Sequence, residues 1–126
     1  MSKEELTKYW FDSAEQDLLT ADALMNSKRY MHSLFFCHLM LEKILKGIIS
    51  RFDDTSYMTH DLLLLLEKAK IEINKDQAKF LGEVNTFNIR ARYDDYKNSL
   101  YNKATEQYAN DYFNRSREFK KWIEQK

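Results

Sequence analysis

The chain contains no proline and only two glycines in 126 residues. An average soluble sequence of this length carries roughly six prolines and eight or nine glycines. Turns and β-sheets depend on these two residue types far more than helices do. The sequence therefore predicts an all-α protein. Its length suits a single domain over residues 1–126, since a second domain of ordinary size has no room.

The charge balance, the single cysteine and the lack of long apolar segments indicate which broad class of protein this is. Twenty basic residues cancel twenty acidic ones, whereas a protein that binds nucleic acid mainly through its phosphates usually carries a basic excess. Cys37 is the single cysteine, so the fold cannot depend on an internal disulfide. The start of the chain is polar and unlike a signal peptide, and the leucine run at 62–66 is far shorter than the roughly 20 residues that span a bilayer. We expect a soluble cytoplasmic protein that does not enter a membrane.

Apolar residues recur at steps of three and four, which predicts an up-and-down antiparallel bundle of about five helices. The predicted helices cover residues 3–26, 30–50, 61–70, 75–92 and 104–125. The loop between the first two is short, so they should form an antiparallel hairpin. Thr59 or Asp61 can cap the third helix and Asn74 the fourth. The segment 93–102 breaks the periodicity before the last helix.

Two helices also carry packing predictions. On the fourth helix, Phe80 and Phe87 occupy positions that flank an apolar stripe, which consists of Ala78, Leu81, Val84/Asn85 and Ile89. The last helix is rich in aromatic residues, which favours core or dimer packing over a base-stacking surface. The acidic first helix and the basic last helix are expected to pack near each other.

A series of short motifs follows one another in a characteristic order. The motifs are Trp10-x3-Ala14-x2-Asp17-Leu18-x2-Ala21, Tyr30, Phe35-Phe36-Cys37-His38, Glu42-Lys43-x2-Lys46-Gly47, Thr59-His60-Asp61-Leu62 and Arg92-Tyr93. In this order and spacing the chain resembles the HEPN family, the higher eukaryote and prokaryote nucleotide-binding domain, over residues 10–93.

The resemblance implies a helical bundle that forms a homodimer and is often encoded beside a minimal nucleotidyltransferase, as a toxin–antitoxin or nucleotide-handling pair. Many relatives are metal-independent ribonucleases with an Arg followed, after four to six residues, by a His. The matching arginine here would be Arg90 or Arg92, and no histidine stands at that spacing. The resemblance therefore implies a nucleotide-binding or partner-binding protein without ribonuclease activity and without a cofactor. The alternatives are a toxin-type ribonuclease that uses His60 or Tyr96 as a displaced acid or base, and an interaction module with no ligand.

Candidate ligand-binding residues lie on the second helix. His38, Glu42 and Lys46 follow one another at steps of four and form one ridge. Such a ridge could hold a nucleotide phosphate through Lys43 or Lys46, with Glu42 orienting an arginine of the fourth helix. Two structural alternatives stay open: a Glu42–Lys46 pair within the helix, or a buried Glu42 neutralised by an arginine of the fourth helix.

A second candidate group closes the fourth helix. Arg90 and Arg92 could grip a phosphate while Tyr93 stacks on a base. In the alternative interpretation, the two aspartates that follow neutralise the arginines and Tyr93 seals the bundle. His60 could supply an imidazole, although its place before Asp61 at a helix start favours a capping or docking role.

No metal site is predicted. Cys37 and His38 are adjacent on a helix and diverge by about 100°, so they cannot easily share an ion. Cys37 is better interpreted as a small apolar residue of the core.

Overall fold

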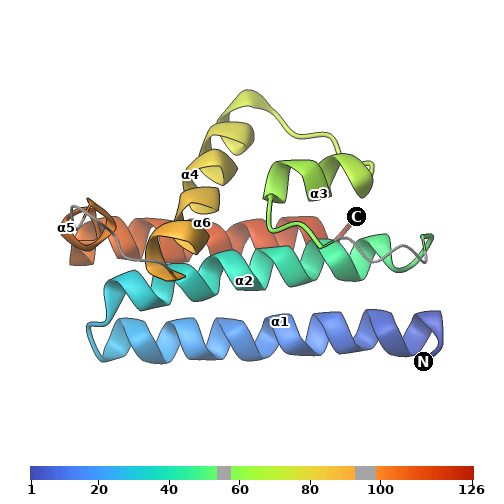
Figure 1. Ribbon diagram of the computed structural model, residues 1–126, viewed down its shortest axis with the longest axis horizontal. Coiled ribbons are helices and arrows are strands. Elements are labelled where there is room, and N and C mark those ends of the chain that lie inside the picture. Colours follow the sequence, from blue (N-terminus) through green and yellow to red (C-terminus); the bar gives the residue numbers. More distant parts are fainter. Residues whose placement is uncertain (54–57, 93–98) are drawn as a thin grey trace.

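The computed structural model describes residues 1–53, 58–92 and 99–126, and these form helices joined by loops (Figure 1). The helices are α1 (Lys3–Asn26), α2 (Tyr30–Ile49), α3 (Leu62–Lys68), α4 (Lys75–Arg92), α5 (Ser99–Lys103) and α6 (Glu106–Glu124). The described residues contain no strand, and the predicted all-α class is confirmed. The short helix α5 falls in the segment that was predicted to break the periodicity, so the described chain has six helices rather than about five. None of the helices found in the described ranges combines the length and apolar character needed to cross a membrane.

Helices α1 and α2 form the predicted antiparallel hairpin (Figure 1). Lys28 takes a left-handed backbone conformation, with φ of 62°, and the Arg29 amide donates to the Leu24 carbonyl at 2.8 Å, which closes the tight turn. Farther along, the two helices approach closely at Gly47. A Cβ atom there would lie 2.7 Å from Cε1 of Phe11 and 3.1 Å from Cβ of Trp10. Glycine in a helix interior costs about 1 kcal/mol, and this contact explains why it stands there.

Helix α4 lies across α2 in the view of Figure 1, whereas α1, α2 and α6 follow the long axis of the molecule. It packs on α2 and α3, and its aromatic rings meet α6, where Phe80 stacks on Tyr112 at 5.7 Å between ring centroids. Phe80 and Phe87 are therefore buried, with exposed fractions of 4% and 0%. The positions that flank the predicted stripe are therefore buried as well, because neighbours cover α4 on more than one side.

The predicted helix caps are confirmed. The Asp61 carboxylate accepts from the Leu63 amide at 3.0 Å and caps α3. Asn74 and Gln77 exchange side-chain and backbone hydrogen bonds of 2.8 and 2.9 Å, a capping box at the start of α4. Helix α2 differs, because Arg29 occupies its N-cap position and provides no side-chain acceptor.

Lys120 joins the acidic α1 to the basic α6, as the sequence predicts for these helices. Its ammonium lies 3.0 Å from both Glu15 on α1 and Glu124 on α6. Burial alone lowers the pKa of Lys120, but the two carboxylates outweigh that effect and the pKa is raised above its ordinary value. The aromatic residues of α6 pack inward against α4, for example Phe87 on Tyr112 at 5.6 Å, which confirms the core interpretation.

Candidate functional site

Glu42 on α2 is a buried carboxylate with an exposed fraction of 5%. Its Oε2 atom accepts a hydrogen bond from Nζ of Lys46 at 2.9 Å, and its Oε1 atom accepts one from Nδ1 of His60 at 2.9 Å. A buried carboxylate is costly unless it is paired, and here each oxygen has its own partner. We call Glu42, Lys46, His60, His38 and Asn88 the Glu42 cluster.

His38, which precedes Glu42 by four residues on α2, is fully buried. Its Nε2 atom donates to the His60 carbonyl at 2.8 Å, and its Nδ1 atom accepts from Nδ2 of Asn88 on α4 at 3.3 Å. Because Asn88 offers an N–H group to Nδ1, the proton of the neutral imidazole belongs on Nε2. Burial lowers the pKa of His38, against the smaller opposing effect of Glu42, so the ring stays neutral. His38 thus ties the His60 backbone to α4.

The segment that carries His60 is fixed on both sides. The Asp61 amide donates to Oγ1 of Thr59 at 3.1 Å, and the Leu62 amide donates to Oδ1 of Asn85 on α4 at 2.9 Å. Nδ2 of Asn85 in turn donates to the Asp61 carboxylate at 2.8 Å. Contacts from α2 and α4 therefore hold the His60 backbone in one place, and the ring docks on Glu42 while Asp61 provides the cap.

The His60 imidazole is a positioned group with one side open to solvent. Its side chain is 50% exposed, although its Nδ1 atom is bound to a carboxylate that is 6% exposed. Within the described part of the chain, Nε2 of His60 makes no hydrogen bond. A carboxylate that fixes one ring nitrogen and leaves the other accessible orients the ring for proton transfer or for contact with an anion.

The two lysines that were predicted to hold a phosphate, Lys43 and Lys46, have separate roles. Lys46 lies against Glu42 and 5.7 Å from the Trp10 ring centroid. Lys43 instead reaches α1, where it forms a 2.9 Å ion pair with Asp17 and a 2.8 Å hydrogen bond to Ser13. Burial raises the pKa of Asp17, and Lys43 opposes that shift. The structure therefore groups Lys46 with Glu42 and directs Lys43 to the hairpin.

The remaining predicted residues can be placed only in part. Arg90 and Arg92 belong to the last turn of α4, and Arg92 follows Asn88 by four residues; the structure does not describe the side chains of either arginine. Tyr93 and Tyr96 lie outside the described residues. The predicted Glu42–Lys46 pair is present. The described partners of buried Glu42 are Lys46 and His60, a histidine that sequence reasoning did not join to Glu42.

Sequence reasoning placed Asn85 on the apolar stripe without assigning it a role, and it missed Asn88. Both lie on the face of α4 that carries buried Val84 and Phe87, and Asn88 itself is only 4% exposed. A side-chain amide on an apolar helix face must find a hydrogen-bond partner. The two asparagines among apolar residues were therefore the sequence signal for a polar contact at this face of α4. Among the described residues, no group of three or more His, Cys, Asp or Glu side chains is arranged to hold a metal ion.

Comparison with known proteins places these features in a family. The family model described as the HEPN domain matches residues 7–126, nearly the whole chain. Neither the curated proteins nor the solved structures yield a match to the chain. The matched range includes the whole Glu42 cluster, all of α2 and α6, and α1 except for its first four residues. The chain therefore belongs to the HEPN domain family.

Proposed function

We propose that this protein is a nucleotide-binding HEPN module that works as a homodimer, pairs with a minimal nucleotidyltransferase and does not cleave RNA. The observation that carries the proposal is the half-exposed His60 ring, fixed by its Nδ1 atom to buried Glu42. Lys46 already balances the Glu42 charge at 2.9 Å. With the Glu42 charge balanced by Lys46, no net negative charge in the cluster repels a phosphate group that approaches the exposed edge of the His60 ring.

The neighbouring turn of α4 supports the same function. Asn88 is bonded to His38 within the cluster, and Arg92 follows Asn88 by one helical turn. An arginine binds phosphate through two parallel N–H groups. The absence of a histidine four to six residues beyond Arg90 or Arg92 supports a binding role rather than ribonuclease chemistry.

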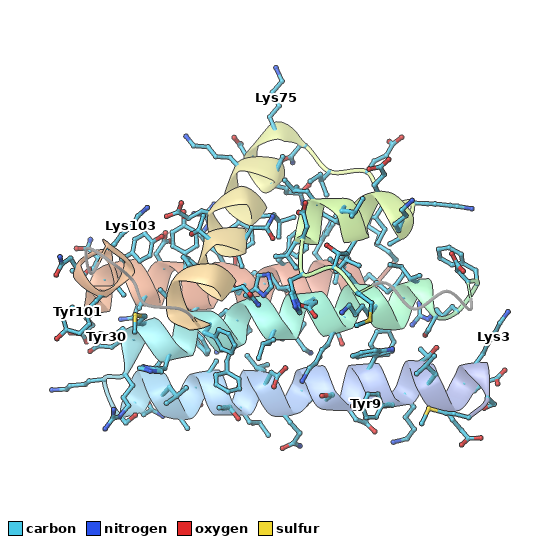
Figure 2. The ribbon with its side chains drawn as sticks, viewed as in Figure 1. Lys3, Tyr9, Tyr30, Lys75, Tyr101 and Lys103 are labelled. Atoms are coloured by element: carbon cyan, nitrogen blue, oxygen red, sulfur yellow. The ribbon has the colours of Figure 1, made fainter. Side chains whose placement is uncertain are left out.

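The experiment is a thermal-shift panel of AMP, ATP and GTP on the purified chain, followed by titration of any nucleotide that stabilises it. We expect wild type to be stabilised, and His60→Ala and Arg92→Ala each to weaken binding by about tenfold, the effect of one lost charge-assisted contact of roughly 1.4 kcal/mol. Lys75→Ala is the matched control, because Lys75 is exposed at the start of α4 (Figure 2). No stabilisation by any of these nucleotides at saturation would contradict nucleotide binding.

The Glu42–His60 pair also favours a second function, a metal-independent ribonuclease. In that reaction Nε2 of His60 takes the proton of a ribose 2′-hydroxyl and the new 2′-oxygen–phosphorus bond forms. The bond between phosphorus and the 5′-oxygen breaks, and the 5′-oxygen takes a proton from solvent water. Incubation with total RNA distinguishes the two functions. We expect no cleavage; cleavage that leaves cyclic phosphate ends and disappears in His60→Ala would replace the binding proposal by the enzyme.

A further inference from the structure

A separate cavity lies at the other end of α2, between the α1–α2 turn and the start of α6. Its volume is about 520 Å³, within the range of pockets that hold small ligands. Lys28, Arg29 and His32 line it together with Tyr30 and Tyr101, and Figure 2 shows the two tyrosines at the same end of the molecule. Tyr30 precedes Glu42 by twelve residues, about 18 Å along a helix, so the cavity is distinct from the Glu42 cluster.

The cavity is strongly biased in charge. Two of its lining residues, Lys28 and Arg29, are cations, a third is His32, and none of the described lining residues is acidic, although Lys and Arg together equal Asp and Glu in number over the whole chain. Within the described ranges, the side chains of Lys28, Arg29 and His32 form no hydrogen bond or ion pair. A concave surface that is lined by positive charges raises the local concentration of anions.

The backbone at the start of α2 also favours an anion in the cavity. The first three residues of α2 are Tyr30, Met31 and His32, all of which line the cavity. Arg29 at the N-cap provides no acceptor for their amides, and a cation at this end of a helix opposes the helix dipole. An anion in the cavity would satisfy the basic side chains and offset that unfavourable charge.

We propose that this cavity binds a phosphomonoester group. The Arg29 guanidinium supplies a planar pair of donors and Lys28 a compact charge, a combination suited to a terminal phosphate. Tyr30 and Tyr101 line the same cavity, where their rings can contact the molecule that carries the phosphate. The carrier is either a free small molecule or the 5′ end of an RNA, which share this group. The proposal goes beyond the nucleotide site at Glu42 and shares no residue with it.

The test is a titration of ¹⁵N-labelled protein followed by amide chemical shifts, at constant ionic strength. The probes are inorganic phosphate, AMP, and one RNA tetranucleotide with either a 5′-phosphate or a 5′-hydroxyl. We expect phosphate to move the amides of residues 30–32, and Lys28→Met/Arg29→Met to weaken this binding at least tenfold. Lys75→Met/Lys121→Met removes the same charge from exposed positions on α4 and α6 and should leave the affinity unchanged.

The carriers are separated by the remaining probes. Tighter binding of AMP than of phosphate identifies a free small molecule, and binding of the phosphorylated RNA but not its hydroxyl form identifies an RNA end. His60→Ala should leave the phosphate-induced shifts at residues 30–32 unchanged. The experiment therefore distinguishes the loss of the nucleotide site at Glu42 from the loss of the phosphate site in the cavity. Equal phosphate affinity in the two double variants, or shifts confined to residues around His60, would overturn the proposal. Thermal midpoints confirm that each variant is folded.

Discussion

At the scale of single residues, the most informative position is His38. It is fully buried, and it contacts the His60 backbone and Asn88 of α4 through its two ring nitrogens. The hydrogen bonds fit the neutral form of the His38 ring. In the charged form, the proton on Nδ1 would point at the N–H group of Asn88, which is also a donor. His38 therefore determines where the exposed ring of His60 lies.

Stability should fall as the pH is lowered from 7.5 to 5.5. The pKa of His38 lies below its ordinary value of 6.5 in the folded protein, mainly because of burial. The unfolded chain then takes up a proton below pH 6.5 that the folded chain does not, so this contribution is present above that pH and lost below it, by at most about 1.4 kcal/mol per pH unit. Urea unfolding at several pH values measures the slope. His38→Gln keeps one donor and one acceptor and should give a smaller slope; an equal slope in both proteins contradicts the assignment.

The Cys37 thiol should be unreactive in the folded protein. It is fully buried, and burial raises its pKa from 9.0 to about 12, against a smaller effect of Ser116. At pH 8 this leaves roughly a thousandfold less thiolate than in the unfolded chain, and the thiolate is the reactive form. We expect reaction with a thiol reagent such as DTNB to be slower by at least that factor than in denaturant. Comparable rates in the two states would show that Cys37 is accessible.

At the scale of elements, α2 is the helix on which the others depend. It pairs with α1 through Gly47, holds α4 through the His38–Asn88 contact and holds the loop before α3 through Glu42 and His60. Twelve of its 20 residues are buried, among them the charged Glu42, so it is enclosed on several sides. A change in α2 packing should therefore affect the site as well as stability.

Gly47→Ala tests the close approach of α1. Alanine favours helix formation by about 1 kcal/mol over glycine, so at an uncrowded position it would stabilise the protein. Here its methyl group would lie 2.7 Å from the Phe11 ring and 3.1 Å from Cβ of Trp10, and such overpacking typically costs 1–3 kcal/mol. We expect net destabilisation in urea unfolding. Gly82→Ala is the control, because no atom lies within 4 Å of the added methyl group, and it should stabilise; stabilisation by both substitutions would contradict the close contact.

At the scale of the whole molecule, the exposed apolar side chains are unevenly distributed. Phe52, Met58, Leu63 and Leu64 are 36–87% exposed, the first two between α2 and α3 and the last two in the first turn of α3. Lys70 covers one of them only partly, lying 5.2 Å from the Phe52 ring centroid. Clustered exposed apolar residues are typical of association surfaces, which is consistent with the proposed homodimer.

Light scattering at micromolar concentration should therefore give about twice the chain mass of 15.2 kDa. Leu63→Glu places a charge among these residues and should shift the mass toward the monomer. Leu19→Glu makes the same change on α1, at a position that is 56% exposed and distant in sequence, and should leave the dimer intact. A wild-type mass near 15.2 kDa would exclude the homodimer at that concentration.

The sequence by itself determined every described helix of this protein except the short α5. Helix boundaries follow from the spacing of apolar residues, and caps such as Asp61 and Asn74 act on amides two or three residues away, so both can be predicted from short stretches of chain. The Glu42–Lys46 pair is local in the same way. Order and spacing of short motifs were enough to predict the HEPN family.

Only the tertiary structure decided which side chains meet across the elements. Glu42 takes His60, 18 residues away, as its second partner. Lys43, which was predicted to hold a phosphate beside Glu42, pairs with Asp17 on α1. Phe80 and Phe87 are buried because α4 has neighbours on more than one side. Helical periodicity specifies which face of a helix is apolar, but not which residues of another helix will face it. That choice depends on how the helices cross, and the site is built from those crossings.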